Sequence, residues 1–295
     1  MYKTMLVPLD RSKAAEIVLP YAEEISAKLD TEIVLVSVSE SSVADKEQSP
    51  EAYLERVREQ VQSDLKDRWD KKDVQVKSKV LSGKPADEIL RYADESNVSL
   101  IALTSRGSSG PRPWPLGSVA AKILRAAVRP VLLIRAQTSE LAPQQKRLIK
   151  KILVPLDGSK RGEAAIPYTE ALARALGAEI VLFQVIEPVV TWGIYEDYRS
   201  YLPPTDLESR KASAKAYLDG VGKTLEDKGL STSSMVDYGL PARTTIAYVK
   251  ANEIDLIAIS THGRSGIALW VFGDVTDKLL HTGDTAVLVV RPSKV

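Results

Sequence analysis

Short apolar runs alternate with longer amphipathic segments along the whole chain. In the first half the runs are rich in Val, Ile and Leu, and they predict strands near residues 4–9, 33–38, 74–81, 99–104 and 131–135. In the second half they predict strands near residues 150–156, 179–186, 232–238, 255–260 and 286–291. Between the first two runs, apolar residues recur at helical spacing from Ala14 to Leu29, which predicts one helix. This alternation is typical of βαβ units, in which helices cover both faces of a parallel sheet.

The same stretch of sequence opens both halves of the chain. MLVPLDRSK at Met5 to Lys13 and ILVPLDGSK at Ile152 to Lys160 share seven of nine residues, 147 positions apart. EIVLVSVSE and EIVLFQVIE keep that spacing, whereas PVLLIR and AVLVVR lie 156 positions apart. The second half therefore carries nine extra residues. We expect them in a surface loop over residues 191–204, where aromatic and acidic residues cluster without a regular period.

The repeat and the length of the chain predict two domains of one kind. At about 150 residues per domain, 295 residues suggest two, and a hydrophobic content of 44% is enough to fill two cores. A polar stretch with one proline predicts a linker over residues 137–147, so we expect domains at 1–136 and 148–295. The predicted fold class is α/β, with two tandem open parallel sheets of five strands, each flanked by helices.

Charge and composition exclude several classes of function. The formal charge of +1 is spread among interspersed acids and bases, so we expect neither nucleic acid nor membrane as a partner. No apolar run approaches the ~20 residues that cross a bilayer, and no signal-like core opens the chain, which favours a cytoplasmic location. Cysteine is absent, and neither His262 nor His281 has a catalytic partner at a recognisable spacing. We therefore expect no conventional catalytic centre.

Candidate binding residues lie where the predicted strands end. In an open parallel sheet, ligands bind beyond the carboxyl ends of the strands. The first strand of each half ends in Pro-Leu-Asp, which places Asp10 and Asp157 at that edge. Each carboxylate either accepts a hydrogen bond from a ligand amine or hydroxyl, or holds the turn that starts the next helix. Ser12 and Ser159 are the predicted N-caps of those helices.

A second feature follows the fourth strand of each half. Thr104-Ser-Arg-Gly107 lies nine residues before Gly117-Ser118, and Ser260-Thr-His-Gly263 lies nine residues before Gly273-Asp274. Glycine lets the backbone approach a phosphate, and the helix that follows offers free N–H groups and the positive end of its dipole. The spacing therefore outlines a phosphate cradle in both halves.

With these motifs the sequence resembles the universal stress protein (UspA) superfamily in its tandem two-domain form, over nearly the whole chain. The resemblance rests on the V-P-L-D opening of both halves, the G-x-P turn before the third helix, and S-T-H-G-R-S-G from Ser260 to Gly266. It implies a Rossmann-like, adenine nucleotide alpha hydrolase-like fold. It also implies that adenine lies near one of two matching sets of residues, which are Pro8, Asp10 and Val38, and Pro155, Asp157 and Val185.

ATP-binding members of this family carry Gly-x-x-Gly, nine residues, and then Gly-Ser or Gly-Thr around the ribose and phosphates. Here Thr104 and Ser260 replace the leading glycine. Asp274 places a carboxylate where it competes with a polyphosphate, caps the helix or holds Mg²⁺. The first half, with Gly117-Ser118, is therefore the favoured site.

Two functions remain open from the sequence. One is binding of ATP or AMP in at least one half, with Mg²⁺ if the ligand is ATP and with slow hydrolysis at most. The other is a nucleotide-independent scaffold with degenerate pockets. Relatives often pair through their last strands, so the resemblance also implies a pseudo-dimer within one chain through PVLLIR and AVLVVR, open to further homodimer formation.

Overall fold

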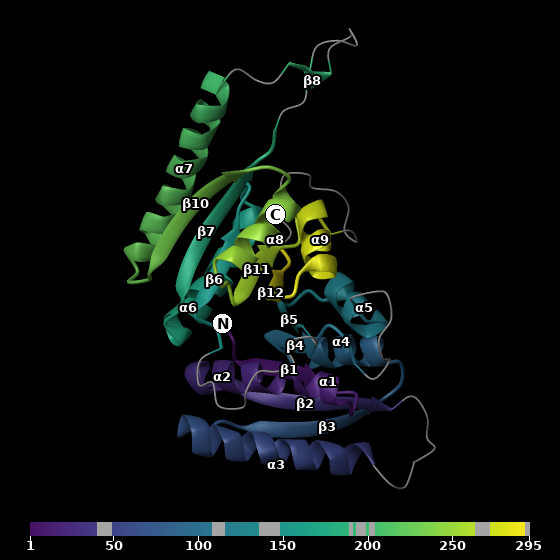
Figure 1. The fold of residues 1–295 in the computed structure, drawn as a ribbon. Helices are drawn as coiled ribbons and strands as arrows, with labels where there is room; N and C mark the ends of the chain where they lie inside the picture. The colour runs from purple at the N-terminus through teal and green to yellow at the C-terminus, as the bar shows by residue number, and fades with distance from the viewer. Residues whose placement is uncertain are drawn as a thin grey trace.

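The computed structural model describes residues 1–39, 49–107, 116–135, 148–188, 191–192, 199–200, 204–262 and 272–292. Among them, ten strands form one sheet that runs through the whole molecule (Figure 1), in the order β10-β7-β6-β11-β12-β5-β4-β1-β2-β3. The first half contributes β1 (Thr4–Pro8), β2 (Glu32–Ser39), β3 (Val76–Ser82), β4 (Leu100–Thr104) and β5 (Val131–Ile134). The second half contributes β6 (Lys151–Pro155), β7 (Glu179–Ile186), β10 (Thr232–Tyr238), β11 (Leu256–Ser260) and β12 (Ala286–Val290). All ten overlap the strands predicted from the apolar runs.

The two predicted five-stranded sheets join into one, because the last strands of the two halves pair with each other. Within each half every strand pair is parallel. At the junction β5 and β12 run antiparallel, and Leu132 lies opposite Leu288. Both leucines are fully buried. Pairing covers two apolar strands that would otherwise be exposed edges, which confirms the predicted pseudo-dimer within one chain.

The hydrophobic core is divided by the face of the sheet, and each of its two parts contains residues from both halves. One face packs against α2 (Leu19–Leu29), α3 (Pro50–Trp69), α6 (Ile166–Leu176) and α7 (Pro204–Glu226). The other face packs against α4 (Pro85–Glu95), α5 (Ser118–Ala126), α8 (Pro241–Ala251) and α9 (Asp274–Thr282). Each face carries one hydrophobic cluster with residues from both halves, since side chains alternate across β5 and β12.

The helix predicted from Ala14 to Leu29 is interrupted. A short α1 (Lys13–Glu16) comes before α2, because Pro20 has no N–H to donate to the carbonyl one turn earlier. Pro167 interrupts the second half in the same way, where the 3-10 helix η1 (Gly162–Ala165) comes before α6.

One of the two predicted N-caps is confirmed. Ser12 is the N-cap of α1, and its Oγ accepts a hydrogen bond from the N–H of Ala15 at 3.1 Å. Ser159 Oγ accepts one from the N–H of Gly162 at 3.1 Å, but the N-cap residue of η1 is Arg161.

The predicted surface loop over residues 191–204 contains a short antiparallel pair, so the loop prediction is only partly right. β8 (Thr191–Trp192) pairs with β9 (Arg199–Ser200). Figure 1 shows β8 beyond the end of α7 that lies farthest from β5. The remaining residues before α7 lie outside the described part of the chain. Among the described residues, no helix has the length and apolar character needed to cross a membrane.

Candidate functional site

The carboxyl edge of the first half brings Asp10 and Gly107 into contact. Asp10 follows β1 and Gly107 follows β4, and these two strands are neighbours in the sheet. The two residues are so close that a Cβ built on Gly107 would lie 1.8 Å from Asp10 Oδ2. Any larger residue at position 107 would therefore displace the carboxylate or the loop.

The Asp10 carboxylate also holds the turn that starts α1. Its Oδ1 accepts hydrogen bonds from Ser12 N at 3.1 Å and from Ser12 Oγ at 2.5 Å, while the residue stays exposed. The turn-holding alternative for Asp10 is thus confirmed. A ligand contact by the same carboxylate stays a prediction.

Asp157 repeats this arrangement in the second half. Its Oδ1 accepts from Ser159 N at 2.9 Å and from Ser159 Oγ at 2.6 Å. A Cβ on Gly162 would lie 2.6 Å from the same oxygen. Gly263, the counterpart of Gly107, lies outside the described residues.

The hydroxyls that replace the leading glycines form hydrogen bonds within their own loops. Thr104 Oγ1 donates to the carbonyl oxygen of Arg106 at 2.7 Å, and Ser260 Oγ donates to that of His262 at 3.0 Å. Both side chains are only 6% exposed. These hydroxyls therefore shape the start of the loop, a role that the motif alone did not predict.

A backbone hydrogen bond ties the start of each loop to the start of the next helix. Gly117, the N-cap residue of α5, donates its N–H to the carbonyl of Ser105 at 2.8 Å. Gly273, the N-cap residue of α9, donates to Thr261 at 3.0 Å. Among the described side chains none caps either helix, so the first-turn N–H groups remain for water or an anion.

The two helix starts differ in charge. The first turn of α5 has no acidic residue, and Ser118 is exposed there. The first turn of α9 contains Asp274 and Asp277, and the Asp274 carboxylate forms an ion pair with Lys278 at 2.7 Å. Gly273 takes the N-cap position, so the cap alternative for Asp274 is wrong. The field at the start of α5 therefore favours an anion more than the field at the start of α9.

The residues expected beside adenine lie at the ends of neighbouring strands. Pro8, the last residue of β1, pairs with Val36 of β2, and half-buried Val38 follows two residues later. In the second half Pro155 pairs with Phe183, and half-buried Val185 again follows two residues later. Each half thus brings its proline, aspartate and valine together at the carboxyl ends of its strands.

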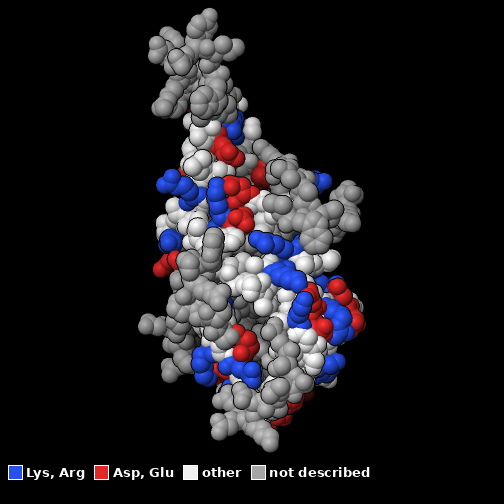
Figure 2. Space-filling model, turned by 90° about the vertical axis from the view of Figure 1, so that its right-hand side faces the viewer, with Lys and Arg blue, Asp and Glu red and all other residues white. Residues whose placement is uncertain are grey.

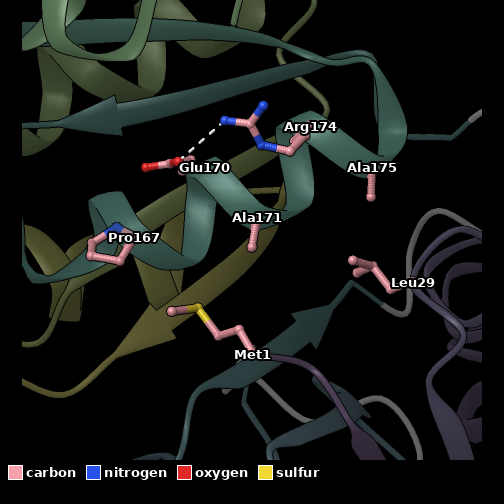
Figure 3. Close-up of a pocket in the computed structure, with 7 residues that line it drawn as sticks. All are labelled: Met1, Leu29, Pro167, Glu170, Ala171, Arg174 and Ala175. Carbon is pink, nitrogen blue, oxygen red and sulfur yellow. Dashed lines mark hydrogen bonds and ion pairs between the residues drawn. The ribbon is translucent and has the colours of Figure 1, made fainter. Parts of the chain in front are cut away.

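A cleft of about 470 Å³ lies between the halves, away from this edge (Figure 3). It is lined by Met1, Leu29, Pro167, Glu170, Ala171, Arg174 and Ala175. Met1 precedes the first strand, whereas the candidate residues follow the strand ends. Glu170 pairs with Arg174 at 3.3 Å and with Lys228 at 2.7 Å, so its charge is compensated at the cleft wall. No pattern in the sequence predicts this cleft, because it lies between segments that are far apart along the chain.

Acidic and basic side chains are intermixed on the face that Figure 2 shows. Among the described residues, no group of three or more His, Cys, Asp or Glu is arranged to hold a metal ion.

Comparison with known proteins identifies the family. Residues 1–135 and 148–291 each match the model of the Universal stress protein family, so the chain belongs to that family, as a tandem member. Universal stress protein YxiE of Bacillus subtilis is 30% identical over 148 residues, which cover 46% of this chain and 100% of the relative. Universal stress protein Rv2005c of Mycobacterium tuberculosis is 26% identical over 222 residues, which cover 74% of this chain and 70% of the relative.

A solved structure has the same fold over the whole chain. The crystal structure of a universal stress protein from Archaeoglobus fulgidus superposes with a TM-score of 0.66 at 19% identity. The match covers 99% of this chain and 100% of that one.

Proposed function

We propose that this tandem universal stress protein binds an adenine nucleotide, ATP or AMP, in at least one half, and that the first half is the preferred site. The observation that carries the proposal is the start of α5, which has no acidic residue in its first turn and no side-chain cap among the described residues, and which the Gly117 N–H joins to the carbonyl of Ser105 after β4. Free N–H groups at a helix start suit a phosphate. Asp10, in contact with Gly107, lies at the neighbouring strand end, where it is available to the base or the ribose.

The described residues of the first half fit each part of such a ligand. Pro8 and Val38 offer apolar surface for the base. Asp10 can accept a hydrogen bond from the adenine amine or a ribose hydroxyl, since a carboxylate has room for several donors. The start of α5 faces the phosphates. With ATP, Mg²⁺ enters bound mainly to the phosphates and water, as it commonly does in proteins.

In the second half we expect weaker binding, because Asp274 and Asp277 lie in the first turn of α9 and Lys278 offsets only part of their charge. Slow hydrolysis is the most that we expect of either half. The cytoplasmic location, a homodimer and the exclusion of nucleic acid stay predictions.

The alternative is a scaffold that binds no nucleotide. It is favoured by the hydroxyls of Thr104 and Ser260, which are bound within their loops at positions where ATP-binding relatives carry glycine.

The test begins with mass spectrometry of any nucleotide released when the freshly purified protein is denatured. Calorimetric titration with Mg-ATP and with AMP follows, on the wild type, Asp10→Ala and Asp157→Ala. Ser12→Ala is the matched control, since it weakens the same turn and keeps the carboxylate. We expect Asp10→Ala alone to remove the tighter binding. No released nucleotide and no heat from either ligand would leave the scaffold as the function.

A further inference from the structure

Two equivalent arginines cross the junction between the halves. Arg135 directly follows β5, and Arg291 directly follows β12. Because β5 and β12 run antiparallel, the carboxyl end of each strand lies beside the amino end of the other. Each arginine therefore lies beneath the last turn of a helix that belongs to the opposite half.

Arg135 closes the carboxyl end of α9. Its two terminal nitrogens donate to the carbonyl oxygens of Leu279 at 2.7 Å and Leu280 at 2.8 Å, and its Nε donates to Thr285 at 3.4 Å. The side chain is only 4% exposed. Burial lowers the pKa of Arg135 to about 10, with nearby Asp284 opposing the change, so the guanidinium stays charged at neutral pH. A buried cation at the end of a helix stabilises its last carbonyls and the negative end of its dipole. The Leu279 carbonyl accepts from the Gly283 N–H as well, at 3.2 Å.

Arg291 does the same for α5, with fewer contacts. It donates to the carbonyl oxygen of Arg125 in the last turn of α5. It is half-buried, and its Nε has no partner in the described part of the chain. The anchor is thus reciprocal but unequal, with α9 held more firmly than α5.

These two helices are the ones that begin at the candidate phosphate sites. The start of α5 at Gly117 and the start of α9 at Gly273 are each one helix length from an arginine of the other half. We propose that Arg135 and Arg291 are positioning residues. Each holds the carboxyl end of the phosphate-facing helix in the opposite half, so that each half positions a helix of the other half's site. This inference rests on the proposed nucleotide binding.

The test uses Arg135→Met and Arg291→Met in the full-length chain, because methionine keeps much of the side chain and removes every donor. Hydrogen exchange is measured on peptides covering α5 and α9. We expect Arg135→Met to speed exchange in α9 about tenfold and to leave α5 unchanged, since charge-assisted hydrogen bonds are lost only there. Arg291→Met should give the opposite pattern, with a smaller change. Arg135→Lys replaces Arg135→Met if the latter does not fold, with a smaller effect in the same helix.

Affinity separates a positioning role from a purely structural one. We expect Arg291→Met, a change in the second half, to weaken Mg-ATP or AMP binding in the first half about fivefold. Arg135→Met should leave that affinity unchanged. Hydrogen exchange that rises equally in α5 and α9, or that rises only in the half that carries the substitution, would show that the arginines do not hold the helix of the opposite half.

If hydrogen exchange rises in the helix of the opposite half but the affinity for nucleotide stays at the wild-type value, the positioning role is wrong. If the wild type binds neither nucleotide, the proposed function and the positioning role fail together, and the exchange pattern still decides whether the anchor crosses the junction.

Discussion

Single residues explain how one turn is built twice with different sequences. After β1 the chain passes through Arg11 at φ +69°, and at the same point after β6 it passes through Gly158 at φ +80°. Both conformations lie in the left-handed region, which costs a residue with a side chain roughly 1–2 kcal/mol and costs glycine little. The first half thus keeps the turn that positions Asp10 in spite of this cost.

Exchanging these two residue types gives a stability prediction. Gly158→Ala should lower the free energy of unfolding by about 1 kcal/mol, and Arg11→Gly should raise it by roughly 0.5 kcal/mol, because glycine relieves the strain and loses more chain entropy on folding. Urea denaturation measures both values. Arg11→Ala is the control, since it removes the guanidinium and keeps the strain. Equal stability of Arg11→Gly and Arg11→Ala would contradict the strain argument.

The charge at the two helix starts gives a binding prediction. Asp274→Ser should strengthen nucleotide binding in the second half, and the reverse change Ser118→Asp should weaken it in the first. A carboxylate in the first turn is worth up to about 1 kcal/mol against an anion, which corresponds to roughly fivefold in affinity. Calorimetric titration of both variants with Mg-ATP checks the pair. Unchanged affinity in Ser118→Asp would place the phosphates away from α5.

For single residues, the sequence predicted which ones lie at the carboxyl ends of the strands better than it predicted their hydrogen bonds. Asp10 and Ser12 were predictable, because a strand end followed by Asp and Ser is a recognisable turn and cap. The hydrogen bond from Thr104 to Arg106 was not, since it depends on the path of a loop that no periodicity describes.

Among the elements, strands were easier to predict than helices. The inner strands are short apolar runs bounded by turn residues, and burial on both faces removes any need for alternation. The outermost strands β3 and β10 are more polar and partly exposed. The first helix was predicted as one piece because its apolar spacing continues through Pro20. The structure has two helices there, since a missing N–H matters more than the pattern.

The contact between α2 and α3 gives a pH prediction. Glu23 of α2 is almost fully buried and pairs with Arg68 of α3 at 3.0 Å. Burial, together with the charge of Asp64, raises the pKa of Glu23 from 4.5 to about 8, with Arg68 opposing the change. The folded chain therefore holds this proton more tightly than the unfolded chain. As a result, the free energy of unfolding should fall as the pH rises from about 4.5 to about 8.

Glu23→Gln removes the titrating group and keeps an oxygen that accepts from Arg68. We expect the variant to lose this part of the pH dependence and to be more stable than the wild type at pH 8, by on the order of 2 kcal/mol. Urea denaturation at pH 5, 6.5 and 8 on both proteins measures the difference. Parallel pH profiles would assign the slope to other groups.

For the whole molecule, the sequence predicted two similar halves that pair through their last strands. The structure adds that the sheet and both hydrophobic clusters continue across this pairing. Nothing in one half alone specifies that its core continues into the other. The continuity arises from antiparallel pairing of β5 with β12, which aligns both faces of the sheet at once. The crossed contacts of Arg135 and Arg291 follow from the same pairing, so no reading of either half by itself would reveal them.

A cleaved chain tests whether the two halves form one folding unit. We expect a protease site inserted in the predicted linker, residues 137–147, to be cut without separating the halves, because β5 and β12 bury their side chains against each other. Size-exclusion chromatography with light scattering should show one species with the mass of the whole chain.

In Leu288→Ala, a cavity opposite Leu132 should cost about 2–5 kcal/mol and promote dissociation of the cut chain. Arg174→Ala, at the cleft and outside the strand junction, should stay associated. Two half-sized species from the cut wild type would mean that the linker, and not the shared sheet, holds the halves together.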